Sequence, residues 1–444
     1  MSVIIKNTLI LTQDDKRRRI KGDIYIEDNI IREVSAKPID VEADFKIDGR
    51  GKVTIPGLIN LHTHIPMTLL RGYGDDMVLE EWLRNRIWPV ERKLDRDSVS
   101  AGTDLGLLEM ISTGTTSFAD MYFFEDTIAE RTRKAGLRGF LGFSFLDFGT
   151  PEYRFDELFP RCEDFVRRWK DDGLITPTIA PHSTYTCSPE TLERCADIAD
   201  RHDLLIQVHC SETQHEVHDV WRRYKARPLE VLRKAGLLND RTILAHCGWI
   251  TKGEVREIAR HGASISHNPV SNMKLATGGF TPLPELFKEG ANVGIGTDGP
   301  ASNNTLDMFE SMKFVALLHK HHRWDPCVAK AQEVLDMATI HGAKALHAFD
   351  RIGSIEEGKL ADLVVIDFKK PHLTPCYDVV SHLIYACRSL DVYATIVDGK
   401  VLMLGDDFLT LDKDEVMERS RREAERLTGE IGCWGSSVSS SPSC

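Results

Sequence analysis

Eight short apolar runs between residues 53 and 298 constrain the fold of this chain most strongly, because seven of them lead to side chains that can bind a metal. These seven are VTIPGLIN before His62 and His64, TTSFAD ending at Asp120, TPTIAPH at His182, LLIQVH at His209, TILAH at His246, SISH at His267 and VGIGTD at Asp298. Only the third run, RGFLGFSF, ends without one. If the runs are parallel strands of a closed barrel, their carboxyl ends meet at one rim and gather these side chains around one point.

Helical patterns separate the apolar runs over residues 57–350. The segments expected to be helical include 97–113, 189–202, 228–235 and 305–319. Strands that alternate with helices eight times predict an α/β fold, namely a (β/α)8 TIM barrel.

The two ends of the chain have a β pattern instead. Residues 1–56 contain NTLILT and DIYIEDNIIREV, and residues 351–405 contain GKLADLVVID and VYATIVDGK. We expect these segments to form one small β-sandwich that is discontinuous in sequence. Residues 406–432 are expected to carry a C-terminal helix, with its amphipathic pattern over 412–431. The Ser-rich residues 433–444 are expected to be a disordered tail.

Composition and charge bear on the partners and on the location expected for the protein. The net charge of −12 argues against nucleic acid, since phosphate contacts need a basic face. No apolar run approaches the roughly 20 residues that a membrane span needs. The opening MSVIIKNTLI reads as a strand and not as a signal peptide. The ten cysteines form no C-x-x-C pair, which favours a reduced, cytoplasmic location.

The segment His62-Thr63-His64 is the first candidate metal motif. Residues i and i+2 of an extended segment point the same way, so both rings can reach one ion. Alone the motif is weak, because two unrelated surface histidines would look the same. Its place directly after a buried strand favours the metal interpretation.

His209 and Asp298 would complete a set of three imidazoles and one carboxylate, which are good ligands for a divalent metal. Such an ion lowers the pKa of water from ~15.7 toward ~7. Asp298 precedes Gly-Pro and could instead cap a helix, but the neighbouring strand ends agree with a ligand role. No lysine follows the fourth strand to bridge a second ion, so a single metal is the simpler interpretation.

Other polar residues near the strand ends are candidates for proton transfer and binding. Glu212, three residues beyond His209, could carry a proton between water and substrate, or it could be an ordinary solvated glutamate. His246 could be a fifth ligand or could hydrogen-bond the attacking water, and we favour the second role. His182 could hold the substrate. Asp120 and His267 could equally be structural groups.

Several motifs resemble the amidohydrolase superfamily over residues 1–405. They are PGLINLHTH, VHCSE, LAHC, SHNPVSNMKLA, GIGTDGPASNN and ADLVVID. Within that superfamily, EEWLRNRIWPVE at 80–91 and SNMKLATGG at 271–279 look like the branch of 5′-methylthioadenosine/S-adenosylhomocysteine deaminases and 5′-deoxyadenosine deaminases. The resemblance implies metal-dependent hydrolysis of 5′-substituted adenosines to the matching inosines and ammonia.

The resemblance also implies roles for individual residues. It implies one divalent ion, usually zinc and sometimes iron or manganese, on His62, His64, His209 and Asp298. Catalysis would fall to Asp298, which takes a proton from the attacking water, to Glu212, which protonates the purine, and to His246 beside the water. The substrate would be bound by Glu91 on the ribose hydroxyls, by His182, and by the pocket walls Trp82 and Trp88.

The third strand departs from the family pattern. Relatives that act well on S-adenosylhomocysteine can carry an arginine at the end of this strand, where our alignment places Phe143. Arg138 lies near the start of the strand, far from the rim. Because phenylalanine cannot pair a carboxylate, we expect Phe143 to favour a short apolar 5′ group, as in 5′-deoxyadenosine or 5′-methylthioadenosine.

Three alternatives remain open. Guanine or cytosine deaminases and triazine hydrolases share the barrel and much of the metal set. A non-catalytic barrel that acts as a binding protein would lack ligands, which this chain has. A nucleic-acid deaminase is disfavoured because neither H-x-E nor P-C-x-x-C occurs. The family habit further implies a homo-oligomer, with a tetramer as one form.

Overall fold

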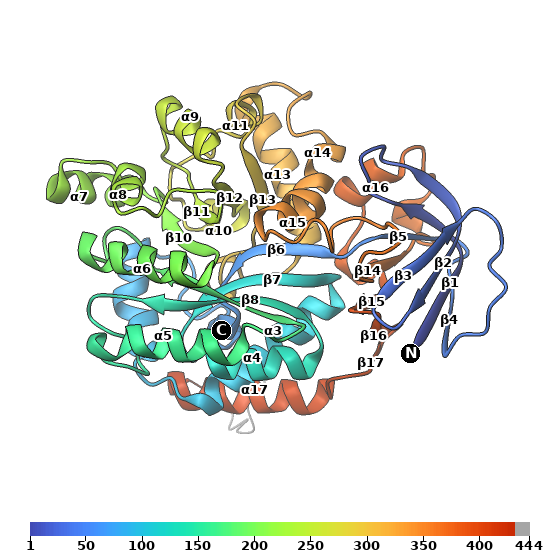
Figure 1. The fold of residues 1–444 in the computed structure, drawn as a ribbon, viewed down its shortest axis with the longest axis horizontal. Helices are drawn as coiled ribbons and strands as arrows, with labels where there is room; N and C mark the ends of the chain where they lie inside the picture. The colour runs from blue at the N-terminus through green and yellow to red at the C-terminus, as the bar shows by residue number, and fades with distance from the viewer. Residues whose placement is uncertain (431–444) are drawn as a thin grey trace, which may run out of the picture.

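The computed structural model describes residues 1–430, so the predicted tail over 433–444 lies outside the described residues. The chain forms an eight-stranded parallel barrel and a separate nine-stranded sheet built from both of its ends (Figure 1). The predicted fold class is confirmed. The division of the chain into domains at residues 56, 350 and 405 stays a prediction.

The barrel strands follow one another in sequence order. They are β6 (Leu58–Thr63), β7 (Thr115–Tyr122), β8 (Arg138–Phe145), β9 (Ile175–Pro181), β10 (Ile206–Cys210), β11 (Thr242–His246), β12 (Ser264–His267) and β13 (Asn292–Ile295). Beyond β13 the chain meets β6 again, where the Asp298 amide donates to the His62 carbonyl at 2.9 Å. The amide of Thr297 donates to Asn60 Oδ1 at 3.0 Å. The barrel therefore closes between β13 and β6, next to His62, the first of the predicted metal ligands.

Helices connect and surround the strands. They are α1 (Leu79–Trp82), α2 (Trp88–Glu91), α3 (Arg96–Ser112), α4 (Glu125–Ala135), α5 (Phe155–Trp169), α6 (Pro189–His202), α7 (Gln214–Tyr224), α8 (Pro228–Lys234), α9 (Lys252–His261), α10 (Pro269–Lys274), α11 (Leu283–Lys288), α12 (Pro300–Asn303), α13 (Met308–Arg323), α14 (Ala331–Asp336), α15 (Gly342–Ala345), α16 (Val379–Tyr385) and α17 (Lys413–Thr428). Segments of 3-10 helix are η1 (Ile65–Leu70), η4 (Pro371–Leu373) and η5 (Ser389–Asp391), and segments of π-helix are η2 (Leu83–Ile87) and η3 (Met337–His341).

Helix caps explain two differences from the predicted boundaries. Helix α13 begins at Met308 and not at residue 305, because the Asp307 side chain accepts from the amides of Phe309 and Glu310 and so starts the helix. Helix α17 ends at Thr428, before the predicted residue 431, because Gly429 adopts a left-handed conformation with φ of 72°.

The second sheet combines the two ends of the chain in the order β17-β16-β15-β14-β5-β1-β2-β3, with β4 paired to β1. Its strands are β1 (Ser2–Leu11), β2 (Arg19–Glu27), β3 (Ile30–Ser35), β4 (Phe45–Asp48), β5 (Lys52–Pro56), β14 (Leu363–Asp367), β15 (Val392–Val397), β16 (Lys400–Leu404) and β17 (Asp407–Phe408). The sheet has its own apolar core, which includes Ile5, Ile24 and Ile396. Strand β17 extends it beyond residue 405, where the second β segment was expected to end.

Buried polar contacts join the sheet to the barrel at the amino ends of the barrel strands. Arg138, the first residue of β8, donates from Nε and Nη2 to the two carboxylate oxygens of Asp362 at 2.9 and 3.2 Å. Its Nη2 also lies 3.4 Å from Asp398 Oδ1. Helix α17 then runs back from the sheet along the barrel, where Ser420 Oγ donates to the Ala101 carbonyl at 3.0 Å (Figure 1).

Over residues 1–430 no helix combines the length and the apolar character that crossing a bilayer demands.

Candidate active site

A cavity of about 620 Å³ opens at the carboxyl ends of the barrel strands. The predicted site residues that line it are His64, Trp82, Trp88, Glu91, His182, His209, Glu212, His246 and Asp298. His62 is buried close to this group, with the ring centroids of His62 and His64 4.9 Å apart. Phe143 does not line the cavity. The barrel thus brings together nearly all of the residues singled out by the sequence.

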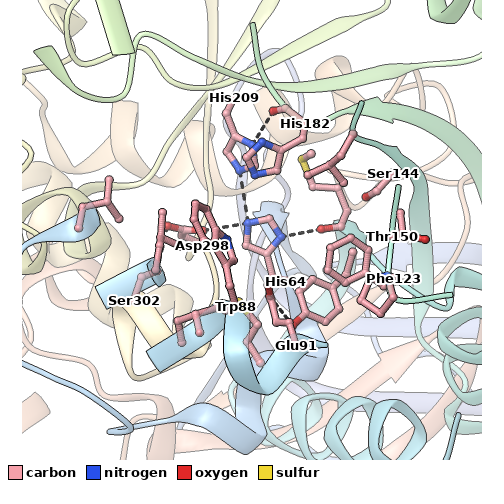
Figure 2. Close-up of a pocket in the computed structure, with 18 of the residues that line it drawn as sticks. His64, Trp88, Glu91, Phe123, Ser144, Thr150, His182, His209, Asp298 and Ser302 are labelled. Atoms are coloured by element: carbon pink, nitrogen blue, oxygen red, sulfur yellow. Dashed lines mark hydrogen bonds and ion pairs between the residues drawn. The ribbon is translucent and has the colours of Figure 1, made fainter. Parts of the chain in front are cut away.

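Three histidines from two strands point their rings at one another. Ligand atoms of His62, His64 and His209 all lie within 4.8 Å of one another. The Nδ1 atom of His64 contacts the Met121 carbonyl at 2.6 Å, and that of His209 contacts the His182 carbonyl at 2.7 Å. Both rings therefore turn Nε2 toward the centre, where the two Nε2 atoms lie 3.3 Å apart (Figure 2). Backbone carbonyls fix these orientations, as they do for metal-binding histidines.

Asp298 adds a carboxylate to the histidines. Its Oδ1 lies 3.5 Å from His62 Nε2 and 3.3 Å from His64 Nε2. The Nε2 atom of His62 is buried and has no hydrogen-bond partner among the described residues. An orphaned nitrogen beside two imidazoles and a carboxylate fits a divalent ion of the zinc type. The residues present therefore suit one metal ion.

The electrostatics of the cluster depend on its burial and its charges. Burial lowers the pKa of His62 to about 4, although Asp298 acts in the opposite direction. Burial alone would raise the pKa of Asp298, but the adjacent imidazoles of His62 and His64 lower it well below its ordinary value. Asp298 is thus a carboxylate at neutral pH, and His62 is a neutral imidazole, which are the forms that bind metals.

Three of the residues at these strand ends have a left-handed backbone, a conformation that also occurs elsewhere in the chain. Ser211, His246 and Asp298 have φ angles of 52°, 72° and 64°, in the left-handed region that non-glycine residues rarely adopt. Each follows or ends a barrel strand that supplies a site residue. Such conformations persist only where the surroundings enforce them, and they are common at functional sites.

Glu212 lies at the rim between the metal ligands and the cavity. Its Oε2 is 3.9 Å from His246 Nε2, and 13% of its side chain is exposed. Burial raises the pKa of Glu212, which favours the protonated form. The protonated form is the one that could donate a proton to a substrate.

Glu216 holds Glu212 in place and was missed by the sequence reasoning. Its two carboxylate oxygens accept from the amides of Ser211 at 3.0 Å and of Glu212 at 2.7 Å. Burial raises the pKa of Glu216 to about 7. The signal was present, because Thr213 and Glu216 have the spacing of a capping box at the start of α7.

Glu91 faces the cavity from the last turn of α2. Tyr122, at the end of β7, donates from its hydroxyl to Glu91 Oε1 at 2.8 Å (Figure 2). Burial raises the pKa of Glu91. The sequence did not identify Tyr122. Trp82 is buried, whereas Trp88 is 39% exposed, so the two indoles form an inner and an outer part of the same wall.

His182 follows β9 and contacts Thr186 Oγ1 through Nδ1 at 2.9 Å. Burial and the neighbouring histidines lower its pKa to about 3, so the ring is neutral at ordinary pH. Its Nδ1 is engaged with hydroxyls, which leaves Nε2 as the atom able to contact a ligand.

The interpretation of Phe143 as a cavity residue is wrong. Neighbouring side chains of a strand point to opposite faces, and in β8 it is Ser144 that lines the cavity. The ring of Phe143 packs in the apolar layer outside the barrel, with centroids 5.6 Å from Phe145 and 6.0 Å from Phe165 of α5. Arg138 lies at the opposite end of the strand, as expected, where it pairs with Asp362.

Asp120 and His267 do not line the cavity. Asp120 Oδ1 accepts from the amide of Ile65 at 2.6 Å, and burial raises its pKa to about 7. His267 Nε2 lies 3.0 Å from His319 Nε2, and its Nδ1 lies 3.1 Å from Thr281 Oγ1. These contacts agree with the structural alternative for both residues.

The fold and the site agree with comparisons to known proteins. Residues 53–402 match the model of the amidohydrolase family, and the chain belongs to that family. It is 47% identical over 406 residues to a 5-methylthioadenosine/S-adenosylhomocysteine deaminase of Thermococcus onnurineus, which covers 91% of this chain and 94% of that protein. It is 43% identical over 428 residues to a 5'-deoxyadenosine deaminase of Methanosarcina acetivorans, covering 96% and 98%.

A solved structure gives the same picture. The crystal structure of an adenosine deaminase from Xanthomonas campestris with bound zinc superposes with a TM-score of 0.93 at 35% identity, covering 96% of this chain and 99% of that one. The family predicted from the motifs is therefore confirmed, and its relatives are hydrolases of the deaminase type.

Proposed function

We propose that this chain hydrolyses 5′-substituted adenosines to the corresponding inosines and ammonia. One observation carries the proposal. The carboxylate of Glu91, steadied by Tyr122, lines the same cavity as the metal-type ligands and Glu212. A carboxylate can accept hydrogen bonds from two neighbouring hydroxyls and therefore suits a ribose. A free base has no such pair of hydroxyls.

Each of the proposed site residues has a distinct role in this reaction. The ion on His62, His64, His209 and Asp298, which we propose to be zinc, supplies Lewis acidity that lowers the pKa of water. Asp298 accepts a proton from the attacking water. Glu212 donates a proton to purine N1, which makes C6 more electrophilic, and the proton held by Asp298 then reaches the leaving amino group. As ammonia departs, the new C6 hydroxyl loses its proton, which restores the acid form of Glu212 and leaves the 6-oxo group of the inosine. Glu91 and His182 hold the sugar, and His246 orients the attacking oxygen.

We further propose a preference for a short, uncharged 5′ group. Ser144, and not Phe143, is the residue of the third strand that supports this. Ser144, Phe123 and Thr150 lie on the other side of His64 from Asp298 and Ser302 (Figure 2). With the purine at Asp298, the 5′ group would extend toward this side, which offers no cation to a carboxylate. Apart from the histidines of the metal cluster and its neighbours, the single basic side chain among the described lining residues is that of Arg92, next to Glu91 in sequence.

A panel of nucleosides and free bases tests the reaction class. Zinc-loaded protein is expected to release ammonia from 5′-deoxyadenosine, 5′-methylthioadenosine and adenosine. It should release no ammonia from guanine or cytosine and no chloride from a chlorotriazine. Glu91→Gln should raise KM more than it lowers kcat, because it weakens the contact with the ribose. Activity on guanine alone would overturn the proposal. A cytoplasmic homo-oligomer without nucleic-acid or membrane partners stays a prediction.

A further inference from the structure

Helix α10 places two adjacent polar side chains against two different strand ends of the site. Ser271 Oγ donates to Asp298 Oδ2 at 2.6 Å, and Asn272 Oδ1 lies 2.8 Å from His246 Nδ1. Ser271 is fully buried and Asn272 is 8% exposed. Helix α10 follows β12, whose own histidine, His267, does not reach the cavity.

Ser271 restricts how the Asp298 carboxylate can turn. Oδ2 receives the hydroxyl of Ser271 and also that of Ser302, at 2.9 Å. Oδ1 accepts from the Gly299 amide at 2.7 Å and faces His62 and His64. Rotation of the carboxylate would break all of these contacts together, so the hydroxyls keep Oδ1 directed at the histidines.

Asn272 decides which nitrogen of His246 carries the proton. The amide oxygen is an acceptor, so the 2.8 Å contact requires a proton on His246 Nδ1. The Asn268 amide nitrogen lies 3.4 Å from the same Nδ1 and would favour the opposite tautomer, but its longer contact is the weaker one. A neutral ring protonated on Nδ1 presents an unprotonated Nε2 to Glu212 and to the cavity.

The two site residues that α10 contacts, His246 and Asp298, are also residues whose conformation requires support from their surroundings. His246 and Asp298 both have left-handed backbones, and each would flank the attacking water in the proposed reaction. A strained backbone keeps its conformation only when surrounding contacts fix it. Adjacent residues of one short helix supply such a contact to both groups.

We propose that Ser271 and Asn272 are positioning residues, which orient Asp298 and set the tautomer of His246. The expected effect on kcat rests on the proposed function, whereas the expected effects on the His246 tautomer and on zinc affinity do not. Loss of the Asn272 acceptor should lower kcat and leave KM nearly unchanged. Loss of the Ser271 hydroxyl should weaken zinc binding, because an outer contact to a ligand commonly contributes about 10–100-fold in metal affinity or activity.

The first test is spectroscopic and needs no substrate. Long-range 1H–15N spectra of histidine-labelled, zinc-loaded protein should show His246 protonated on Nδ1 in the wild type and in Asn272→Asp, which keeps an acceptor. Asn272→Ala should lose that tautomer. An unchanged tautomer in Asn272→Ala would overturn the role of Asn272, whatever the substrate proves to be.

The second test combines zinc affinity with kinetics. Ser271→Ala should bind zinc about 10–100-fold more weakly in a chelator competition, and Ser271→Thr, which keeps the hydroxyl, should bind it nearly as tightly as the wild type. Asn272→Ala should lose up to about 10²-fold in kcat, because the ring that orients the attacking oxygen is misplaced, with recovery in Asn272→Asp. Met273→Ala, at a 37% exposed position of the same helix, is the matched control and should change neither quantity.

The outcomes separate this inference from the proposed function. A wild type without deaminase activity, but with the expected tautomer and zinc effects, would reject the reaction and keep the positioning roles. Ser271→Ala with wild-type zinc affinity would reject the role of Ser271. If both alanine variants match Met273→Ala in zinc affinity and kcat, the inference is wrong.

Discussion

The two ends of the barrel bury polar side chains in different ways. At the amino ends of the strands, the Arg138 guanidinium is 3% exposed and is met by Asp362, Asp398 and the Gly173 carbonyl. At the carboxyl ends, His62 Nε2 has no partner among the described residues, although it is just as deeply buried. Buried polar atoms cost free energy unless they are paired. The paired charge of Arg138 thus joins two parts of the fold, whereas the unpartnered His62 Nε2, beside two imidazoles and a carboxylate, marks a place for a ligand.

The backbone shows the same contrast. The carboxyl ends carry left-handed non-glycine residues at Ser211, His246 and Asp298. The left-handed positions just before β7, β8, β12 and β13 are glycines, which adopt this conformation without strain: Gly114, Gly136, Gly262 and Gly290. In barrels of this kind catalytic groups gather at the carboxyl ends, and the amino ends serve stability. Substitutions at the two ends should therefore affect activity and folding separately.

The largest effect on activity is expected from Glu212→Gln. The amide cannot donate the proton that N1 needs, so kcat should fall by about 10²–10⁴-fold while bound zinc is retained. Because burial raises the pKa of Glu212, its charged form is disfavoured in the fold, and the neutral amide should unfold with an equal or higher free energy above that pKa. Turnover close to that of the wild type would remove Glu212 from the mechanism.

The largest effect on stability is expected from Arg138→Met. It leaves Asp362 buried without its partner, and breaking a buried ion pair in this way costs about 3–5 kcal/mol of unfolding free energy. Urea unfolding measures the loss, and kcat per folded molecule should stay unchanged. The exposed pair of Arg154 and Asp156 provides the control, since Arg154→Met should have an effect below about 1 kcal/mol. An Arg138→Met variant with wild-type stability and a lower kcat would contradict the assignment of stability to the amino ends and of activity to the carboxyl ends.

A smaller effect is expected from Ser144→Arg, which adds a cation on the side of the cavity that lacks one. The ratio of kcat/KM for S-adenosylhomocysteine to that for 5′-deoxyadenosine should rise about 10-fold, as expected for a new charge-assisted hydrogen bond of about 1.5 kcal/mol. Phe143→Leu, in the outer apolar layer, should leave the ratio unchanged. A change in the ratio with Phe143→Leu alone would restore the original interpretation of that residue.

The smallest effect is expected in the pH profile. Glu212 must be protonated to donate, and burial raises its pKa. The value of kcat/KM should therefore fall as pH rises through this raised pKa, and the limb should be absent in Glu212→Gln. A profile that is flat through this range in the wild type would contradict Glu212 as the acid.

The barrel and the metal-type ligands could be predicted from the sequence because seven of the eight apolar runs lead to a side chain that can bind a metal. The side chains that orient the site residues could not be predicted, because their roles depend on where helices and strands meet in space. These side chains are those of Glu216, Tyr122, Ser271 and Asn272. The error at Phe143 had a local cause. The alternation of a strand assigns neighbours to opposite faces, and the polar Ser144 within RGFLGFSF was the available sign of which face lines the cavity.

The most direct test of the account is kcat/KM measured side by side for 5′-deoxyadenosine, 5′-methylthioadenosine, S-adenosylhomocysteine and adenosine with zinc-loaded protein. We expect efficient deamination of the first two, with lower values for S-adenosylhomocysteine and adenosine. A clear preference for S-adenosylhomocysteine would contradict the role of the Ser144 side of the cavity. Absence of deamination with all four nucleosides would contradict the proposed function itself.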